Sequence, residues 1–193
     1  MACDNAYPEL RARAVRVLAT HACSQIRFRL ANIYIGRFMF NYIAGMIDNG
    51  SVNITTGDTP RYEFETNTLM LSGGATPVEI VHEATHLLIY ATHEGKVIRR
   101  GDHETAAYLA AALWALYSDN EIAVDVPHMD IHVRRMAKKV IAFNNANPSG
   151  AYECDPADLQ NIQVLMQASA NGTQINERLV QRGLSQCEKP KAN

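Results

Sequence analysis

The segment from residue 77 to residue 93 constrains the fold most, because its sequence marks both the start of a helix and its burial. Thr76 can cap this helix, Pro77 suits its first position, and Glu79 completes a capping box with Thr76. Apolar side chains cover most of its circumference. A helix that is apolar nearly all round lies inside a protein. The sequence therefore predicts a buried helix that is ended by Gly95.

Polar side chains form one narrow stripe on this helix. With His82 placed at zero on a helical wheel, His86 falls at about 40° and Glu83 at about 100°. Buried imidazoles and carboxylates need partners, because an unpaired polar group inside a protein is strongly destabilising. The stripe therefore predicts a cleft in which these groups surround a cation. Three more side chains share the stripe: Glu79, Tyr90 and His93.

Residues 82–86 read His-Glu-Ala-Thr-His, an HExxH motif. Histidines four residues apart lie nearly above one another on a helix, so both imidazoles can reach one zinc ion at roughly 2.0–2.1 Å. Glu83 is displaced around the helix, where it can hold a water molecule instead of the metal. The motif predicts hydrolysis of a peptide bond with Glu83 as general base. The alternative interpretation is a pair of surface histidines.

A hydrolytic zinc site needs a third protein ligand. His93 lies about 10 Å beyond His86 along the same helix, too far to share the ion. Glu104 is the only carboxylate between residues 103 and 117, and the many alanines there make a thin helix that can approach closely. We therefore predict Glu104 as the third ligand, although an acidic residue is also favoured at a helix N-terminus without any metal. Two neighbours remain as alternatives: Asp102 and His103.

His82, Glu83, His86 and Glu104 together resemble the gluzincins, zinc peptidases with HExxH on one helix and a glutamate ligand on a following helix. The resemblance spans roughly residues 66–117. It implies a compact zincin-like fold with a cleft beside the edge strand of a small sheet, where an extended peptide can add as a further strand.

Two segments are candidates for this edge strand: Leu69 to Leu71, and Tyr62 to Glu65. The chain also departs from the family pattern at one position. The family's glutamate helix often carries an acidic residue four positions after the ligand, where it orients a zinc-bound histidine. Tyr108 occupies that position here, so support for His82 or His86 must come from elsewhere.

The oxyanion formed during hydrolysis needs a hydrogen-bond donor beside the metal. The sequence does not choose among five candidates: Tyr90, His103, Tyr108, His128 and His132. His128 and His132 are also four residues apart, with Asp130 between them, which is compatible with another metal site. The basic residues between positions 128 and 139 favour an ordinary solvated helix face instead.

The predicted fold class is α+β, because helical and alternating patterns follow each other along the chain. Residues 8–47 predict one bent helix or two consecutive helices, with a break near residues 20–24. Alternation between residues 52 and 71 predicts a mostly antiparallel meander of about three short strands. Further helices are predicted over four ranges, the last of them weakly: 103–117 capped by Asp102, 128–144, 155–168 and 174–182.

The length of 193 residues predicts one domain over residues 1–193. We expect a core over residues 8–145, a helical C-terminal extension over 146–186 and a loose tail over 187–193. The four cysteines lie far apart without a CxxC pair, so neither a zinc knuckle nor a disulfide framework is predicted.

A peptide or protein substrate is the partner that the motif predicts. The formal net charge of −2 does not favour nucleic acid or an anionic membrane as partners. A signal peptide and a transmembrane segment are not recognised, which predicts a cytoplasmic location by default and leaves non-classical export open.

Other functions remain compatible with the motif. A metal-dependent sensor or interaction module would use a fourth protein ligand, such as His103, and would not turn over a substrate. A peptidase delivered into other cells as an effector or toxin is a further alternative. The histidine and glutamate ligands also suit divalent metals other than zinc, and the oligomeric state is not predicted.

Overall fold

The computed structural model describes residues 7–118, 130–169 and 177–179, and it has the mixed α+β class that the sequence predicts. The helices are α1 (Pro8–Leu18), α2 (His21–Gln25), α3 (Met39–Asp48), α4 (Pro77–Thr92), α5 (Arg100–Tyr117), α6 (Asp130–Ala146) and α7 (Pro156–Ser169). The strands are β1 (Phe28–Leu30), β2 (Ile33–Ile35), β3 (Asn53–Thr56), β4 (Arg61–Glu63), β5 (Thr68–Leu71), β6 (Val97–Arg99), β7 (Tyr152–Glu153) and β8 (Glu177–Leu179).

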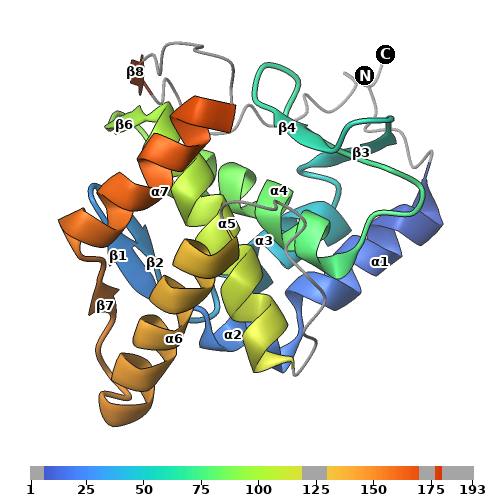
Figure 1. Cartoon of the computed structure of the whole chain (residues 1–193). Helices are drawn as coiled ribbons and strands as arrows, with labels where there is room; N and C mark the ends of the chain where they lie inside the picture. Colours follow the sequence, from blue (N-terminus) through green and yellow to red (C-terminus); the bar gives the residue numbers. More distant parts are fainter. Residues whose placement is uncertain (1–6, 119–129, 170–176, 180–193) are drawn as a thin grey trace, which may run out of the picture.

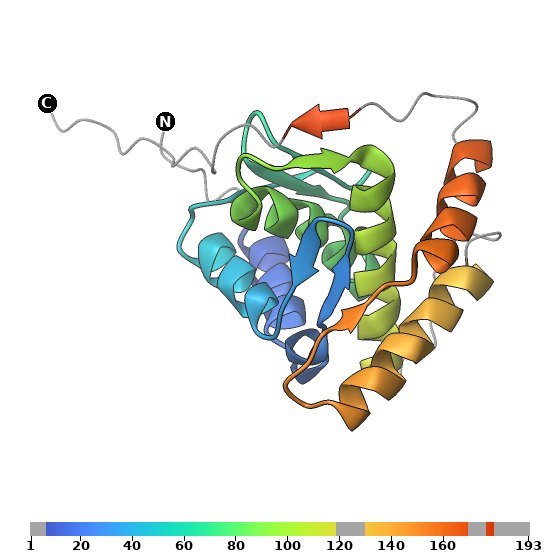
Figure 2. The same cartoon turned by 90° about the vertical axis from the view of Figure 1, so that its left-hand side faces the viewer.

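Helices α4 and α5 pack against each other at the centre of the molecule, and the remaining elements surround them (Figure 1). Helices α6 and α7 lie along the far side of α5 (Figure 2). Because α5 has neighbours on several sides, most of its residues are buried. Small side chains such as Ala106 and Ala110, both fully buried, allow those neighbours to approach.

The start of α4 confirms the predicted capping box. The Thr76 backbone N–H donates to Glu79 Oε2 at 2.6 Å, and the Glu79 backbone N–H donates to Thr76 Oγ1 at 3.3 Å. The helix ends at Thr92, and Gly95 follows with a φ of 75°, a left-handed conformation that glycine adopts without strain. The sequence signals therefore place both ends of this helix correctly.

The sheet before α4 has the predicted number of strands but a different topology. Its order is β3-β5-β4, with β3 parallel to β5 and β4 antiparallel to β5, so the predicted antiparallel meander is wrong. Strand β5 takes the centre because its Leu69 and Leu71 side chains are fully buried. Leu69 to Leu71 is therefore not the edge. Strand β4, which contains Tyr62, is an edge strand.

The N-terminal region differs from the helical prediction over residues 8–47. The predicted break is present, because Thr20 separates α1 from α2 and its side chain accepts a hydrogen bond from the Cys23 backbone N–H. After α2, however, the chain forms the antiparallel hairpin of β1 and β2. Ile33 and Ile35 are buried while Tyr34 between them is exposed, a strand alternation that local helical spacing concealed.

Two boundaries in the C-terminal half also differ. Helix α5 begins at Arg100, so Asp102 lies inside the helix and does not cap it as predicted. Strand β6 causes this shift, because it leads directly into α5 and pairs antiparallel with β8. Residues 177–179 are thus a strand and not part of the helix predicted over 174–182. The predicted tail over 187–193 lies outside the described residues.

None of the described helices combines the length and the apolar composition that a membrane span needs. Cys23 and Cys154 are buried free thiols. Burial raises the pKa of each to about 12, which keeps both thiols protonated and unreactive near neutral pH.

His93 connects the end of α4 to strand β2. Its Nε2 accepts a hydrogen bond from the Tyr34 backbone N–H at 2.9 Å, and its Nδ1 lies 2.8 Å from Thr92 Oγ1. The Thr92 hydroxyl donates to Leu88 O, so Thr92 Oγ1 is free to accept from a proton on Nδ1. The neutral Nδ1–H tautomer therefore satisfies every partner. Burial, followed by the positive charge of Lys96, lowers the pKa of His93.

This contact predicts a pH-dependent loss of stability. The folded-state pKa of His93 lies below its unfolded value of about 6.5. The contribution of neutral His93 to the free energy of unfolding is therefore complete above pH 6.5 and is lost as the pH falls through the folded pKa. Protonation would make Nε2 a hydrogen-bond donor that faces the Tyr34 backbone N–H, which is also a donor. The lost hydrogen bond would cost about 1–3 kcal/mol. Urea unfolding of wild type and His93→Gln, measured from pH 8 to pH 5, tests this prediction. The glutamine amide does not titrate, so the free energy of unfolding of wild type should fall relative to that of His93→Gln as the pH decreases. A pH-independent difference between the two would contradict this assignment.

Candidate metal centre

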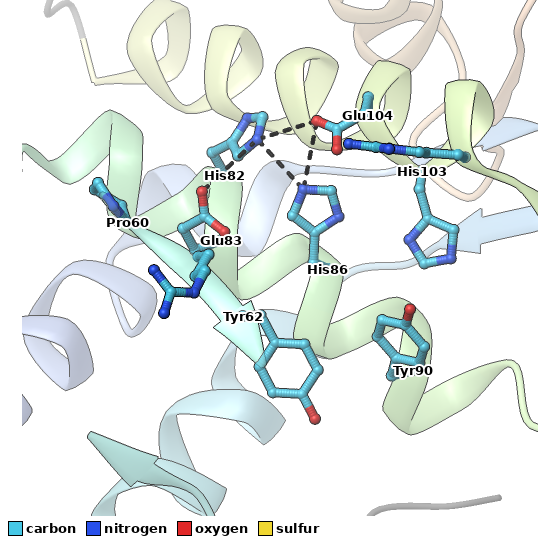
Figure 3. Close-up of a pocket in the computed structure, with 10 residues that line it drawn as sticks. Pro60, Tyr62, His82, Glu83, His86, Tyr90, His103 and Glu104 are labelled. Atoms are coloured by element: carbon cyan, nitrogen blue, oxygen red, sulfur yellow. Dashed lines mark hydrogen bonds and ion pairs between the residues drawn. The ribbon is translucent and has the colours of Figure 1, made fainter. Parts of the chain in front are cut away.

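Three side chains from the two central helices converge on one point (Figure 3). Helix α4 supplies His82 and His86, whose Nε2 atoms lie 3.3 Å apart. Helix α5 supplies Glu104, whose Oε2 lies 3.6 Å from His82 Nε2 and 3.7 Å from His86 Nε2. The structure thus brings together the three residues predicted as metal ligands.

The spacing of these atoms fits a tetrahedral zinc site. Ligand atoms held at roughly 2.0–2.1 Å from zinc at tetrahedral angles are separated from each other by about 3.3–3.5 Å. The observed separations of 3.3, 3.6 and 3.7 Å are close to this geometry. Two imidazole nitrogens and a carboxylate oxygen that face one point repel each other unless a metal ion or a proton lies between them. The donor set therefore fits a divalent metal ion.

The orientation of the histidines follows from the burial of α4. Val81, Ala84, Leu87 and Leu88 are fully buried on the other sides of the helix, which fixes its rotation in the core. Thr85, a polar residue within this apolar surface, donates its hydroxyl hydrogen to Val81 O at 2.7 Å and so needs no other partner. As a result, His82, Glu83 and His86 face α5 and strand β4.

The ring of Tyr108 provides support for His82. Tyr108 lies four residues after Glu104 on α5 and packs edge-on against the His82 imidazole, with 4.5 Å between ring centroids. This contact limits the rotation of the His82 imidazole, although Tyr108 has no carboxylate to form a hydrogen bond with it. Burial, and then the negative charge of Glu104, raises the pKa of Tyr108 and keeps its hydroxyl neutral. Tyr108, the residue at which the sequence departs from the gluzincin pattern, thus still contacts His82, a predicted ligand.

The charges of the ligand group are strongly coupled. Burial opposes the ionisation of Glu104, but the close contacts of its carboxylate with His82 and His86 outweigh burial and lower the pKa of Glu104. Burial likewise disfavours a charged His86, but the Glu104 carboxylate raises the pKa of this imidazole above its usual value. The carboxylate is therefore ionised near neutral pH, as a metal ligand must be.

Glu83 lies beside the ligand group without joining it. Its Oε1 is 3.9 Å from His82 Nε2, and only 11% of its side chain is exposed. Burial is the largest influence on Glu83, and it raises the pKa of the carboxyl group although His82 and His86 act in the opposite direction. A carboxylate with an increased proton affinity is suited to act as a general base.

A cavity of about 610 Å³ opens in front of these side chains. Edge strand β4 and the residue before it form one wall, and α4 and α5 form the others. The lining residues are Pro60, Arg61, Tyr62, His82, Glu83, His86, Tyr90, Arg100, His103 and Glu104. The site is thus open to a molecule that enters along the edge of the sheet.

The remaining candidates from the sequence are dispersed. Tyr90 and His103 line the cavity, with 5.2 Å between their ring centroids, so both remain candidates for the donor. Asp102, an alternative ligand, faces a different cavity. His132 lies on α6 and does not line the site, whereas His128 lies outside the described residues. Among the described residues, His103 is not part of the group that could hold a metal.

Sequence reasoning missed the two arginines that line the cavity, Arg61 and Arg100. Arg100 precedes Glu104 by four residues and therefore shares its face of the helix. This signal was hidden because the helix was expected to begin at residue 103. For Arg61, the signal would have been its place on the edge strand next to Tyr62.

Comparisons of the chain with protein-family models, with curated proteins and with solved structures find no match.

Removal of the Glu104 carboxylate should abolish tight metal binding. Loss of a partner that only supports a ligand lowers metal affinity about 10–100-fold, so loss of a ligand should lower it by more than about 100-fold. Titration calorimetry with zinc on the metal-free protein, together with metal analysis by mass spectrometry, measures this for Glu104→Ala. Glu94→Ala, which removes an exposed carboxylate near the end of α4, is the matched control. Unchanged zinc affinity in Glu104→Ala would exclude Glu104 as a ligand.

Proposed function

We propose that this protein is a zinc-dependent peptidase of gluzincin type with a zincin-like fold. The observation that carries the proposal is the triangle of His82 Nε2, His86 Nε2 and Glu104 Oε2, whose sides of 3.3–3.7 Å suit a tetrahedral metal. Zinc is the favoured metal because two imidazoles and one carboxylate are a ligand set of catalytic zinc sites. Three protein ligands and an adjoining cavity leave room for water and substrate.

The proposed chemistry divides between the metal and Glu83. Zinc at this position would lower the pKa of a water molecule and polarise the carbonyl group of a substrate. The Glu83 carboxylate accepts the proton that the water loses on attack, and it then donates this proton to the nitrogen of the departing amine. Its raised pKa helps Glu83 to retain the proton between the two steps. His82 and His86 remain neutral while they bind the metal.

Edge strand β4 supports a peptide as substrate. Its Arg61 and Tyr62 line the cavity, and β5 is the one strand that pairs with β4 among the described residues. An extended peptide that adds to the other side forms backbone hydrogen bonds whatever its sequence, and its carbonyl groups then pass in front of the proposed metal. A cavity built in this way suits a main chain better than a compact metabolite.

The geometry favours a catalytic site over a metal-dependent sensor or interaction module. A structural zinc site is closed by four protein ligands. Among the described residues, the group that could hold a metal has three members, and these members line the same open cavity as Glu83. A carboxylate with a raised pKa beside the metal has no function in a purely structural site.

Replacement of Glu83 by glutamine separates binding from chemistry. Glu83→Gln keeps the size of the side chain and removes its ability to accept a proton. We therefore expect normal zinc content and a rate of peptide hydrolysis about 10²–10⁴-fold lower. Cleavage of a random peptide library by the zinc-loaded proteins, followed by mass spectrometry, measures both the activity and the cleavage sites.

Glu94→Gln serves as the control, because it makes the same change at an exposed position outside the cavity. Undiminished hydrolysis by Glu83→Gln would exclude Glu83 as the base. If the zinc-loaded wild type cleaves no peptide in the library, the peptidase proposal itself is wrong.

A further inference from the structure

The two arginines of the cavity differ in how their charges are balanced. Arg61 donates from Nε and Nη2 to Glu63 Oε1, the shorter contact being 2.6 Å. Arg100, in contrast, forms no hydrogen bond or ion pair with any residue in the described part of the chain. The positive charge of Arg100 is therefore available to a molecule that enters the cavity.

Arg100 lies close to the proposed metal ligands. It stands four residues before Glu104 on α5, one turn away on the same face, which corresponds to about 6 Å along the helix axis. The charge of Arg100 also acts on His86, where it opposes protonation. Both residues line the same cavity, and the Arg100 residue is exposed. A ligand at the metal can therefore reach the guanidinium group.

A charge balance of the loaded cavity shows what this arginine would attract. The two negative charges of Glu83 and Glu104 offset a divalent cation, with both histidine ligands neutral. The pair of Arg61 and Glu63 is neutral as a unit. The charge of Arg100 remains uncompensated, so the cavity is positive once the metal has bound. A neutral substrate would leave this charge unused.

We infer that Arg100 selects substrates that carry a carboxylate group next to the scissile bond. This inference depends on the proposed peptidase function and specifies its substrate class. The planar guanidinium can donate two parallel hydrogen bonds to a carboxylate, an interaction stronger and more directional than that of a lysine ammonium. The carboxylate belongs either to an aspartate or glutamate side chain or to the C-terminus of the peptide.

Peptide hydroxamates test this inference without turnover, because the hydroxamate group binds zinc directly. Three probes share an N-terminal hydroxamate and differ in the dipeptide that follows, which ends in an amide in the first two probes. The first contains glutamine and is neutral, the second contains glutamate, and the third contains glutamine but ends in a free carboxylate. A second set, with the hydroxamate at the other end, presents glutamine or glutamate on the opposite side of the metal.

Affinities are measured by titration calorimetry for zinc-loaded wild type, Arg100→Gln and Arg99→Gln. Arg99 is a matched control, because it is the adjacent exposed arginine but lines a different cavity. We expect wild type and Arg99→Gln to bind at least one carboxylate probe about tenfold or more tightly than its neutral counterpart. Arg100→Gln should lose this preference and bind the neutral probe within about twofold of wild type. The preferred probe identifies the source of the carboxylate.

Two results would overturn the inference: equal binding of neutral and carboxylate probes by wild type, or a preference that persists in Arg100→Gln. Either result leaves the peptidase proposal intact if the library experiment shows zinc-dependent cleavage. Failure of the peptidase proposal is recognised separately, by the absence of library cleavage. Binding of the neutral hydroxamate to wild type shows independently that the metal is accessible to a ligand.

Discussion

The close packing of α4 against α5 is the contact on which the site depends. Glu104 can lie within 3.7 Å of both histidines only if the two helices approach closely. The residues that follow Glu104 on the same face are Ala107, Tyr108 and Ala111. Tyr108 contacts His82, while the two alanines are almost completely buried and occupy little space. A larger side chain at either alanine would separate the helices and move Glu104 away from the histidines.

The sequence was most informative where the determining interactions are local. The ends of α4 follow from a capping box and a glycine within a few residues of the helix, and the relative position of His82 and His86 follows from helical geometry. Glu104 stands out in the sequence because it is the only carboxylate between residues 103 and 117, a segment rich in small apolar residues. These signals were sufficient to identify the three side chains that converge in the structure.

The failures concern elements whose partners are distant in the sequence. The hairpin of β1 and β2 is extended by β7, more than a hundred residues later, and β3 lies parallel to β5 although β4 pairs with the other edge of β5. Strand β6 pairs with β8, which lies far along the chain. Local periodicity contains no information about such pairings. The error at β6 also shifted the start of α5 and thereby concealed Arg100.

The charges of Glu104 and His86 are consistent with the proposed binding of a cation at this position. Burial alone would favour a neutral Glu104 and a neutral His86, but the observed contacts lower the pKa of the carboxyl group and raise that of the imidazole. A shared positive charge therefore stabilises the group, and without metal a proton on His86 can supply it. Because this imidazole must lose its proton before it binds a metal, protons and metal compete for the same electron pairs. A rise in pH would therefore favour the proposed metal, and a divalent ion would bind all three side chains at once.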